Sequence, residues 1–375
     1  MRIAILADTD SRKKWAYNVA SYFPESNITL FLDFSESIDI LILALGGGAN
    51  YKFLLSFHHY IKETNPRKRP LIISGFNGST DTSNIHALLC RLGSDYICLN
   101  SQKDYEAFSE QLKKLNFPNH TLQLTGMAKD YKYFESKEKD KIVFFAQPDV
   151  PKTKRERVYI VKKLEELATK FPDKQVYIKP RSIKGTKNIT HKEKYYYQDI
   201  VKELKVKYVN LIYDDVEVLL QTIYLSITVG STVAFESIYN NINTVVLSDF
   251  GIRQEYGNHH FIGSGCLLSF EELLNGKIPV IDFEWENKYV LIDENKFHKL
   301  VFLVLSKIKE QNKDKLMLPM MPLFYNKDKY PYYYHNSFRI NIGVRPKKWN
   351  FSYFILNLFD LMKKTGAKII TFYDN

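Results

Sequence analysis

Short, continuous apolar runs alternate with longer stretches of helical spacing along this chain, and that alternation limits the folds it can adopt. Residues 2–7 (RIAILA) form the first run, and residues 38–45 (IDILILAL) are typical of the later ones. Apolar runs without polar alternation indicate parallel strands that are buried on both faces. Helical stretches between such strands favour doubly wound sheets. The sequence therefore predicts an α/β protein.

The same pattern predicts the other elements. Further strands are expected at residues 28–32, 70–74, 95–99, 121–125, 142–146, 175–179, 208–212, 225–229 and 244–247. Helices are expected at residues 51–63, 102–115, 153–170, 194–204, 215–223 and 232–240.

A charged segment poor in aliphatic residues interrupts the alternation at residues 130–141 and is interpreted as a linker. A chain of 375 residues is long enough for two domains. The predicted organisation is two Rossmann-like domains that face each other across a cleft. Their predicted bounds are residues 1–135 and 141–310, with a tail at 311–375.

The charge balance favours anionic partners, since 53 Lys and Arg face 42 Asp and Glu, a net charge of +11. The tail is basic and aromatic, and residues 352–364 suit an amphipathic helix. We expect the tail either to cross back onto the first domain or to dock on an anionic membrane surface.

Several features indicate a cytoplasmic protein. Peripheral contact with the inner face of the cell membrane is compatible with them. The first apolar run is too short for a signal peptide, and Asp8 and Asp10 interrupt it. No apolar run approaches the roughly 18 residues that span a bilayer. The three cysteines have no metal-ligand spacing and suit a reducing compartment.

The most informative motif is LSITVGSTVAFESI, at residues 225–238. Gly230 permits a close backbone approach after the strand, and Ser231 or Thr232 can cap the helix that follows. The helix start would then hold a donor phosphate, and Glu236 would reach ribose hydroxyls. The alternative is an ordinary capped helix with a solvated Glu236.

Two other strand ends in the second half carry polar side chains. Lys179 and Arg181 flank a proline and would suit a diphosphate or a sugar carboxylate. The alternative is an exposed basic turn. Gln147 follows the preceding strand, and its amide could recognise a base edge or a sugar hydroxyl.

In the first half, Asp8 and Asp10 follow the first strand. Either carboxylate could act as the general base that deprotonates an attacking hydroxyl. The alternative is helix capping by Asp10 or Ser11.

Glycine-rich loops follow two later strands of the first half. Gly47, Gly48, Asn50 and Asn77 are candidate residues on the acceptor side of a site. The loops do not form a GxGxxG fingerprint, so dinucleotide binding is not expected. Neither histidine pair has the third ligand of a zinc site, so neither a metal nor a cofactor is predicted.

Taken together, six segments resemble bacterial glycosyltransferases of the GT-B architecture, related to capsule and lipopolysaccharide enzymes of the polysialyltransferase and Kdo-transferase type. The resemblance runs from residue 1 to about residue 270. The segments are residues 7–15 (ADTDSRKKW), 91–104 (RLGSDYICLNSQKD), 144–151 (FFAQPDVP), 178–181 (IKPR), 228–238 (TVGSTVAFESI) and 247–265 (LSDFGIRQEYGNHHFIGSG).

The resemblance implies a first domain for the acceptor and a second for the nucleotide sugar. In the better-known enzymes a Ser/Ser or Ser/Thr pair holds the donor phosphate, and Ser231 with Thr232 matches that position. Those enzymes often carry a His-Pro motif where this chain has Lys179-Pro180-Arg181, so a histidine role cannot be carried over.

The function expected from these observations is metal-independent, inverting transfer of a CMP-activated acidic sugar, sialic-acid-like or Kdo. The acceptor would be a surface glycan or a lipid-linked molecule, as in capsule or lipopolysaccharide synthesis. A UDP-sugar transferase and a sugar-nucleotide epimerase of the same fold are alternatives. A third is a basic protein that binds nucleic acid or anionic glycans, although the main interpretation has no nucleic-acid partner.

Overall fold

The computed structural model describes residues 1–24, 26–29, 38–80, 82, 85–118, 121–127, 139–181, 183–184, 193–290 and 295–321. The chain divides into two compact units, one made of residues 1–129 with the part from 293 onward, the other of residues 130–292. Most of the predicted linker, and the predicted helix at 352–364, lie outside the described residues.

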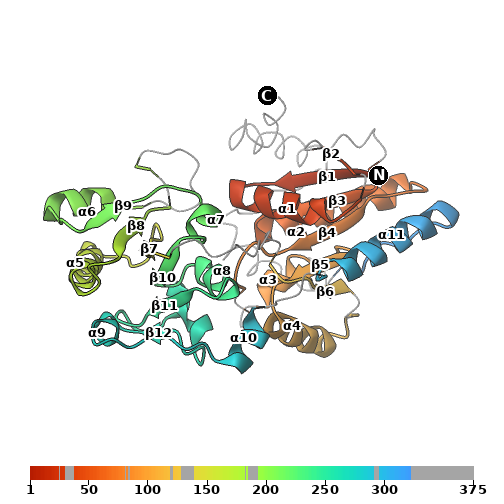
Figure 1. Ribbon diagram of the computed structural model, residues 1–375. Helices are drawn as coiled ribbons and strands as arrows, with labels where there is room; N and C mark the ends of the chain where they lie inside the picture. Colours follow the sequence, from red (N-terminus) through yellow and green to blue (C-terminus); the bar gives the residue numbers. More distant parts are fainter. Residues whose placement is uncertain are drawn as a thin grey trace. The chain divides into compact units, whose positions relative to one another are not determined.

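The first unit is built on a parallel six-stranded sheet of order β2-β1-β3-β4-β5-β6 (Figure 1). Each pair of neighbouring strands is parallel, so all carboxyl ends share one edge. The strands are β1 (Arg2–Ala7), β2 (Asn27–Thr29), β3 (Ile40–Ala44), β4 (Leu71–Gly75), β5 (Tyr96–Leu99) and β6 (Leu122–Leu124).

Helices cover both faces of this sheet because successive strand residues point to opposite sides. Ile3 and Ile5 pack with α1 and α11 on one face, whereas Ala4 and Leu41 pack with α2 on the other. The helices are α1 (Asp10–Ser21), α2 (Gly47–Thr64), α3 (His86–Leu89), α4 (Gln102–Lys114) and α11 (His298–Lys313).

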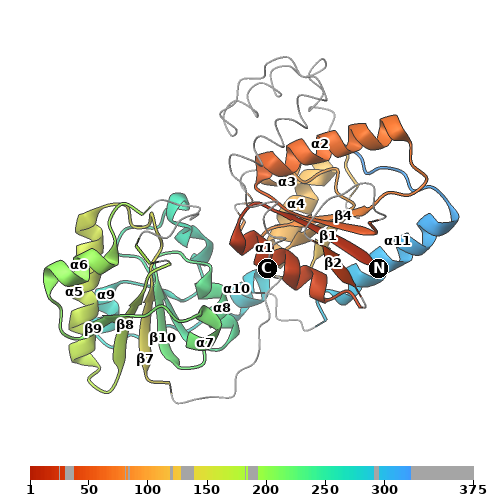
Figure 2. The same ribbon diagram turned by 90° about the horizontal axis from the view of Figure 1, so that it is seen from above.

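The second unit repeats this design with the order β12-β11-β10-β7-β8-β9, again parallel throughout (Figure 2). The strands are β7 (Lys141–Phe145), β8 (Gln175–Lys179), β9 (Val209–Leu211), β10 (Ile223–Thr228), β11 (Asn243–Leu247) and β12 (Leu267–Leu268). The helices are α5 (Lys154–Lys170), α6 (Tyr197–Leu204), α7 (Val216–Leu219), α8 (Val233–Tyr239), α9 (Phe270–Leu274) and α10 (Phe283–Tyr289), with 3₁₀ turns η2 (Gln254–Tyr256) and η3 (Asn258–Phe261).

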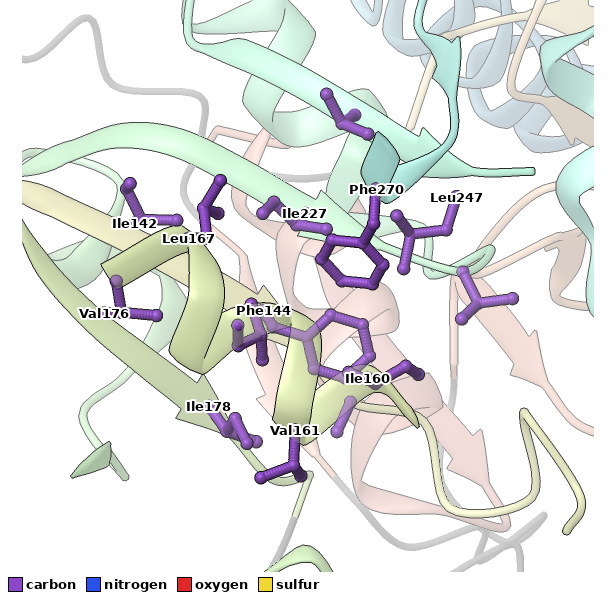
Figure 3. Close-up of a cluster of buried hydrophobic side chains, with 14 of the residues drawn as sticks. Ile142, Phe144, Ile160, Val161, Leu167, Val176, Ile178, Ile227, Leu247 and Phe270 are labelled. Carbon is purple, nitrogen blue, oxygen red and sulfur yellow. The ribbon is translucent and has the colours of Figure 1, made fainter. Parts of the chain in front are cut away.

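The core of the second unit has the same two-sided arrangement. Phe144, which is fully buried, lies among side chains of α5 and Phe270 on one face (Figure 3). Its neighbours Val143 and Phe145 pack with α7 and α8 on the other face. Full burial of one such aromatic side chain is worth about 1.5–3 kcal/mol, which explains why these runs contain no polar residues.

The α/β class with two parallel Rossmann-like sheets is confirmed, and most predicted strands lie within one or two residues of their observed bounds. Two helix predictions were wrong. The helix expected at 215–223 ends at Leu219, because Ile223 already pairs with Lys141 in the sheet. The helix expected at 51–63 begins at Gly47, so the supposed glycine loop is its first turn.

The predicted domain boundary at residue 310 differs from the observed division, since α11 belongs to the first unit. Its side chains Leu300 and Val304 are buried against the first sheet. The last turn of α11 and the segment after it also contact this unit. Gln311 and Arg69 exchange two hydrogen bonds, and Arg69 Nη2 donates to the carbonyl of Met317.

Among the described residues, no helix is both long enough and apolar enough to cross a membrane.

Candidate functional site

Each sheet has a point where the helices change faces, and ligands of open α/β sheets bind beyond the carboxyl ends of the strands there. In the second unit this point lies between β7 and β10. The predicted donor-binding residues follow β7, its neighbour β8, and β10, so they share one edge of the sheet. In the first unit the corresponding point lies between β1 and β3.

The turn after β10 is shaped by the chain's own backbone. A Cβ atom on Gly230 would lie 2.0 Å from the carbonyl oxygen of Tyr256, so only glycine fits between β10 and η2. Glycine was predicted here for close approach of a ligand. The close approach that the structure contains is that of the Tyr256–Asn258 backbone.

The hydroxyl groups after Gly230 remain half-exposed at the carboxyl edge. Ser231 Oγ accepts a long hydrogen bond of 3.4 Å from the backbone N–H of Val233. Thr232 is the N-cap residue of α8 but makes no capping bond with its side chain. Both hydroxyls can therefore still donate to a ligand. Glu236 is only 9 % exposed, in contrast to the solvated position weighed from the sequence.

The two basic residues at the end of β8, Lys179 and Arg181, have different surroundings. Burial lowers the pKa of Lys179, and the neighbouring carboxylates of Asp215 and Asp214 oppose that effect. Arg181 is exposed, and its guanidinium makes no hydrogen bond to the described residues. The positive charge free to meet an anion at this edge is therefore mainly that of Arg181.

The loop after β7 is held by a buried arginine that sequence reasoning missed. Arg157, on α5, donates from Nη2 to the carbonyls of Gln147 at 3.2 Å and Pro148 at 2.6 Å. Its Nη1 lies 2.5 Å from Glu193 Oε1, and Nε donates to the carbonyl of Pro151. Gln147 Oε1 has no hydrogen-bond donor among the described residues. The Gln147 backbone is thus fixed, whereas its buried side-chain oxygen has no partner in the described part of the chain.

In the first unit, Asp8 links the ends of the two central strands. Its Oδ2 accepts a hydrogen bond of 2.8 Å from the backbone N–H of Gly46, and its Oδ1 lies 2.6 Å from Nη1 of Arg12. The Asp8 side chain is 26 % exposed. Both carboxylate oxygens of Asp8 are therefore engaged by donors of this chain.

Asp10 has a different environment. It is exposed at the first position of α1, and its carboxylate makes no hydrogen bond to the described residues. The helix is capped by Thr9, whose Oγ1 accepts from the backbone N–H of Arg12 at 3.4 Å. The alternative assignment of the cap to Asp10 or Ser11 was therefore wrong, and Asp10 is free to act on a ligand.

The predicted acceptor-side residues are distributed over the same edge. Gly47 and Gly48 are half-exposed in the first turn of α2. Asn77 is exposed and donates to Ser11 Oγ at 3.2 Å. Asn50 is only 1 % exposed and donates from Nδ2 to the carbonyl of Cys90, so it is mainly a packing residue.

A second buried arginine, Arg91, approaches this edge from the chain after α3. It is 8 % exposed and donates from Nε to the carbonyl of Gly75 and from Nη1 to that of Ala87. Its guanidinium carbon lies 3.8 Å from the centre of the Phe76 ring. Arg12 was recognisable four residues after Asp8 on a helix, whereas no local pattern identifies Arg91 or Arg157.

No group of three or more His, Cys, Asp or Glu side chains in the described part of the chain has the geometry of a metal site.

Comparison with known proteins assigns this chain to a family. A family model described as "Putative glycosyltransferase (DUF6716)" matches residues 30–301. No curated protein matches the chain in sequence.

Solved structures similar to this one include nucleotide-sugar enzymes. A putative UDP-N-acetylglucosamine 2-epimerase from Listeria monocytogenes has 11% identity and a TM-score of 0.49, covering 84% of this chain and 98% of that one. UDP-GlcNAc 2-epimerase from Methanocaldococcus jannaschii has 12% identity and a TM-score of 0.48, covering 82% and 100%. The wall teichoic acid polymerase TagF has 12% identity and a TM-score of 0.47, covering 83% and 90%.

Proposed function

Because the chain belongs to the DUF6716 glycosyltransferase family, we propose that it transfers a sugar from a nucleotide-sugar donor to a glycan or lipid-linked acceptor. The observation that carries this proposal is the shared edge of β8, β7 and β10 at the point where helices change faces. Arg181, Gln147 and Ser231 end or follow these three adjacent strands. A cation, an amide and a hydroxyl on one edge match the phosphate and hydroxyl groups of a nucleotide sugar.

The proposed reaction needs a base and a stabilised leaving group. Asp10 takes the proton of the acceptor hydroxyl, whose oxygen forms the new bond to the anomeric carbon. The bond from that carbon to the donor phosphate breaks, and its electron pair leaves with the nucleotide. Arg181 and the hydroxyls of Ser231 and Thr232 stabilise the developing negative charge. Such a direct displacement inverts the anomeric centre and involves no metal ion.

Within this class, we propose a CMP-activated acidic sugar as donor, because Arg181 could pair with either the phosphate or the sugar carboxylate. A UDP-sugar is the alternative donor. The proposal also includes kinship with polysialyltransferases and Kdo transferases. It further includes a role in capsule or lipopolysaccharide synthesis and contact with the inner membrane face.

The direct test is calorimetric titration of the whole chain with CMP, UDP and GDP, followed by turnover assays with the sugar form of the base that binds. Saturable binding of one nucleotide and acceptor-dependent release of that nucleotide are expected. Conversion of the sugar nucleotide without acceptor would identify an epimerase instead. Binding to oligonucleotides that weakens steeply with salt, without nucleotide-sugar turnover, would favour the nucleic-acid alternative.

A further inference from the structure

The carboxyl edge of β1 and β3 carries two arginines whose hydrogen-bonding capacity is only partly used. Arg12 bonds Asp8 through Nη1, while its Nε and Nη2 have no partner among the described residues. Arg91 uses Nε and Nη1 on backbone carbonyls. Its Nη2 makes no hydrogen bond within the described part of the chain. Both guanidiniums therefore keep a donor for a further acceptor.

The charges that act on Arg91 do not balance. The groups that act electrostatically on Arg91 are Cys90, Arg12 and Asp8, and burial lowers the pKa of Arg91 to about 10. Arg91 thus stays a cation at neutral pH, and one carboxylate serves two guanidiniums. Cations held together out of bulk water are costly unless an anion joins them.

The backbone adds further donors at the same place. A Cβ atom on Gly46 would lie 3.5 Å from Nη1 of Arg12, so the guanidinium lies against the start of α2. That helix has 18 residues, and the N–H groups of Gly47 and Gly48 in its first turn have no acceptor within the helix.

From this arrangement we propose that the edge of β1 and β3 binds the acidic group of the acceptor, a carboxylate or phosphate carried by a sugar. Arg12 and Arg91 contact the oxyanion, and the Gly47 and Gly48 N–H groups complete the site. The inference rests on the proposed glycosyl transfer and narrows its acceptor to an acidic glycan.

The test compares three sugars that share a ring: glucose, glucuronate and glucose 6-phosphate. Their affinities for the full chain are measured by ligand-observed NMR titration. We expect one acidic sugar to bind about 10–100-fold more tightly than glucose, the range of one or two charge-assisted hydrogen bonds. A preference for glucuronate identifies a carboxylate acceptor, and a preference for glucose 6-phosphate identifies a phosphate acceptor.

Variants locate the site. Arg12→Gln should remove most of the preference for the acidic sugar, and Arg91→Lys should reduce it, since an ammonium cannot keep the planar fork. Arg67→Gln is the matched control, because this exposed arginine precedes β4 at the opposite edge of the sheet. It should leave the preference unchanged.

Equal affinity for all three sugars, or equal effects of Arg12→Gln and Arg67→Gln, would overturn the acidic-acceptor site. The proposed function has its own test, which is nucleotide binding in the second unit, so the two proposals can fail independently. A chain that binds a nucleotide but does not distinguish the sugars keeps the transferase proposal and loses this one.

Discussion

The backbone N–H of Gly46 donates to Asp8 Oδ2 over 2.8 Å and so joins the ends of β1 and β3. This bond crosses the point where the helices of the first unit change faces. It fixes the start of α2 beside the end of the first strand and leaves only the other oxygen of Asp8 for Arg12. One of the two carboxylates proposed as a catalytic base from the sequence therefore joins two strand ends in the structure.

Replacing Asp8 and Asp10 one at a time should have different effects on transfer rate and on stability. Asp10→Asn is expected to lower the transfer rate by about 10²–10⁴-fold, the usual effect of losing a general base, with donor affinity unchanged. Asp8→Asn should instead lower the free energy of unfolding by about 1 kcal/mol, because half-exposed charged bonds are weakened by solvent. Steady-state kinetics and urea denaturation of both variants check this assignment. Full activity of Asp10→Asn would remove this strand end from the mechanism.

Sequence periodicity predicted both sheets because their strands are buried on two faces and read as unbroken apolar runs, as in Ile40–Ala44. It missed β12, which has only two residues, and it misplaced the end of α7. Such short elements depend on tertiary contacts more than on local pattern.

The candidate site could be predicted only in part. Polar residues at strand ends were recognisable, since parallel strands must expose their carboxyl ends at one edge. Arg91 and Arg157 were not, because each acts through backbone carbonyls distant in sequence. Nor could the sequence show that the carbonyl of Tyr256 fills the space that makes Gly230 necessary.

Asp104 gives the unfolding free energy a pH dependence. Burial raises its pKa from 3.8 to about 6, so the folded state binds this proton more tightly than the unfolded state does. The resulting destabilisation is absent below pH 4, grows between pH 4 and 6, and is complete above pH 6. A shift of about two pKa units corresponds to about 3 kcal/mol at most.

Asp104→Asn should therefore raise the free energy of unfolding at pH 8, with the gain disappearing near pH 4. Guanidinium denaturation at both pH values measures it. Glu110→Gln is the control on the same helix, since Glu110 is fully exposed and should show no such gain. A constant difference between Asp104→Asn and wild type across this range would contradict the assignment.

Two truncations should distinguish the roles of the C-terminal segment. Deletion of residues 322–375 keeps Gln311 and Met317, which contact Arg69, and should lower the midpoint of thermal unfolding less than a longer deletion does. Deletion of residues 311–375 also removes the partners of Arg69, Gln311 and the Met317 carbonyl, and should lower that midpoint.

The same pair of variants tests membrane docking. If the basic tail binds an anionic surface, deleting residues 322–375 should abolish cosedimentation with phosphatidylglycerol vesicles at low salt but not the fold. Unchanged cosedimentation would assign the tail's basic residues another role.

Donor binding should depend on hydroxyls and charge at the carboxyl edge of the second sheet. Replacing Ser231 and Thr232 together by Ala removes two donors but keeps the backbone, and each bond to a charged phosphate is worth about 1.5–3 kcal/mol. Stability should change little, since among the described residues the Ser231 hydroxyl makes only one long bond of 3.4 Å and the Thr232 hydroxyl makes no capping bond.

Arg181→Ala should also weaken nucleotide binding, and combined with the Ser231/Thr232 replacement it should add to that loss of affinity. The loss should be larger for a nucleotide sugar whose sugar carries a second negative charge. Lys170→Ala is the matched control, because Lys170 is an exposed cation at the far end of α5, near the amino edge of the same sheet. Calorimetry with the nucleotide that binds wild type measures all of these proteins at one ionic strength. Equal affinity in the Ser231/Thr232 double variant, Arg181→Ala and Lys170→Ala would place the donor phosphate away from β8 and β10. A loss confined to Arg181→Ala would instead assign the phosphate to β8 alone, and the turn after β10 would then serve only to join β10 to α8.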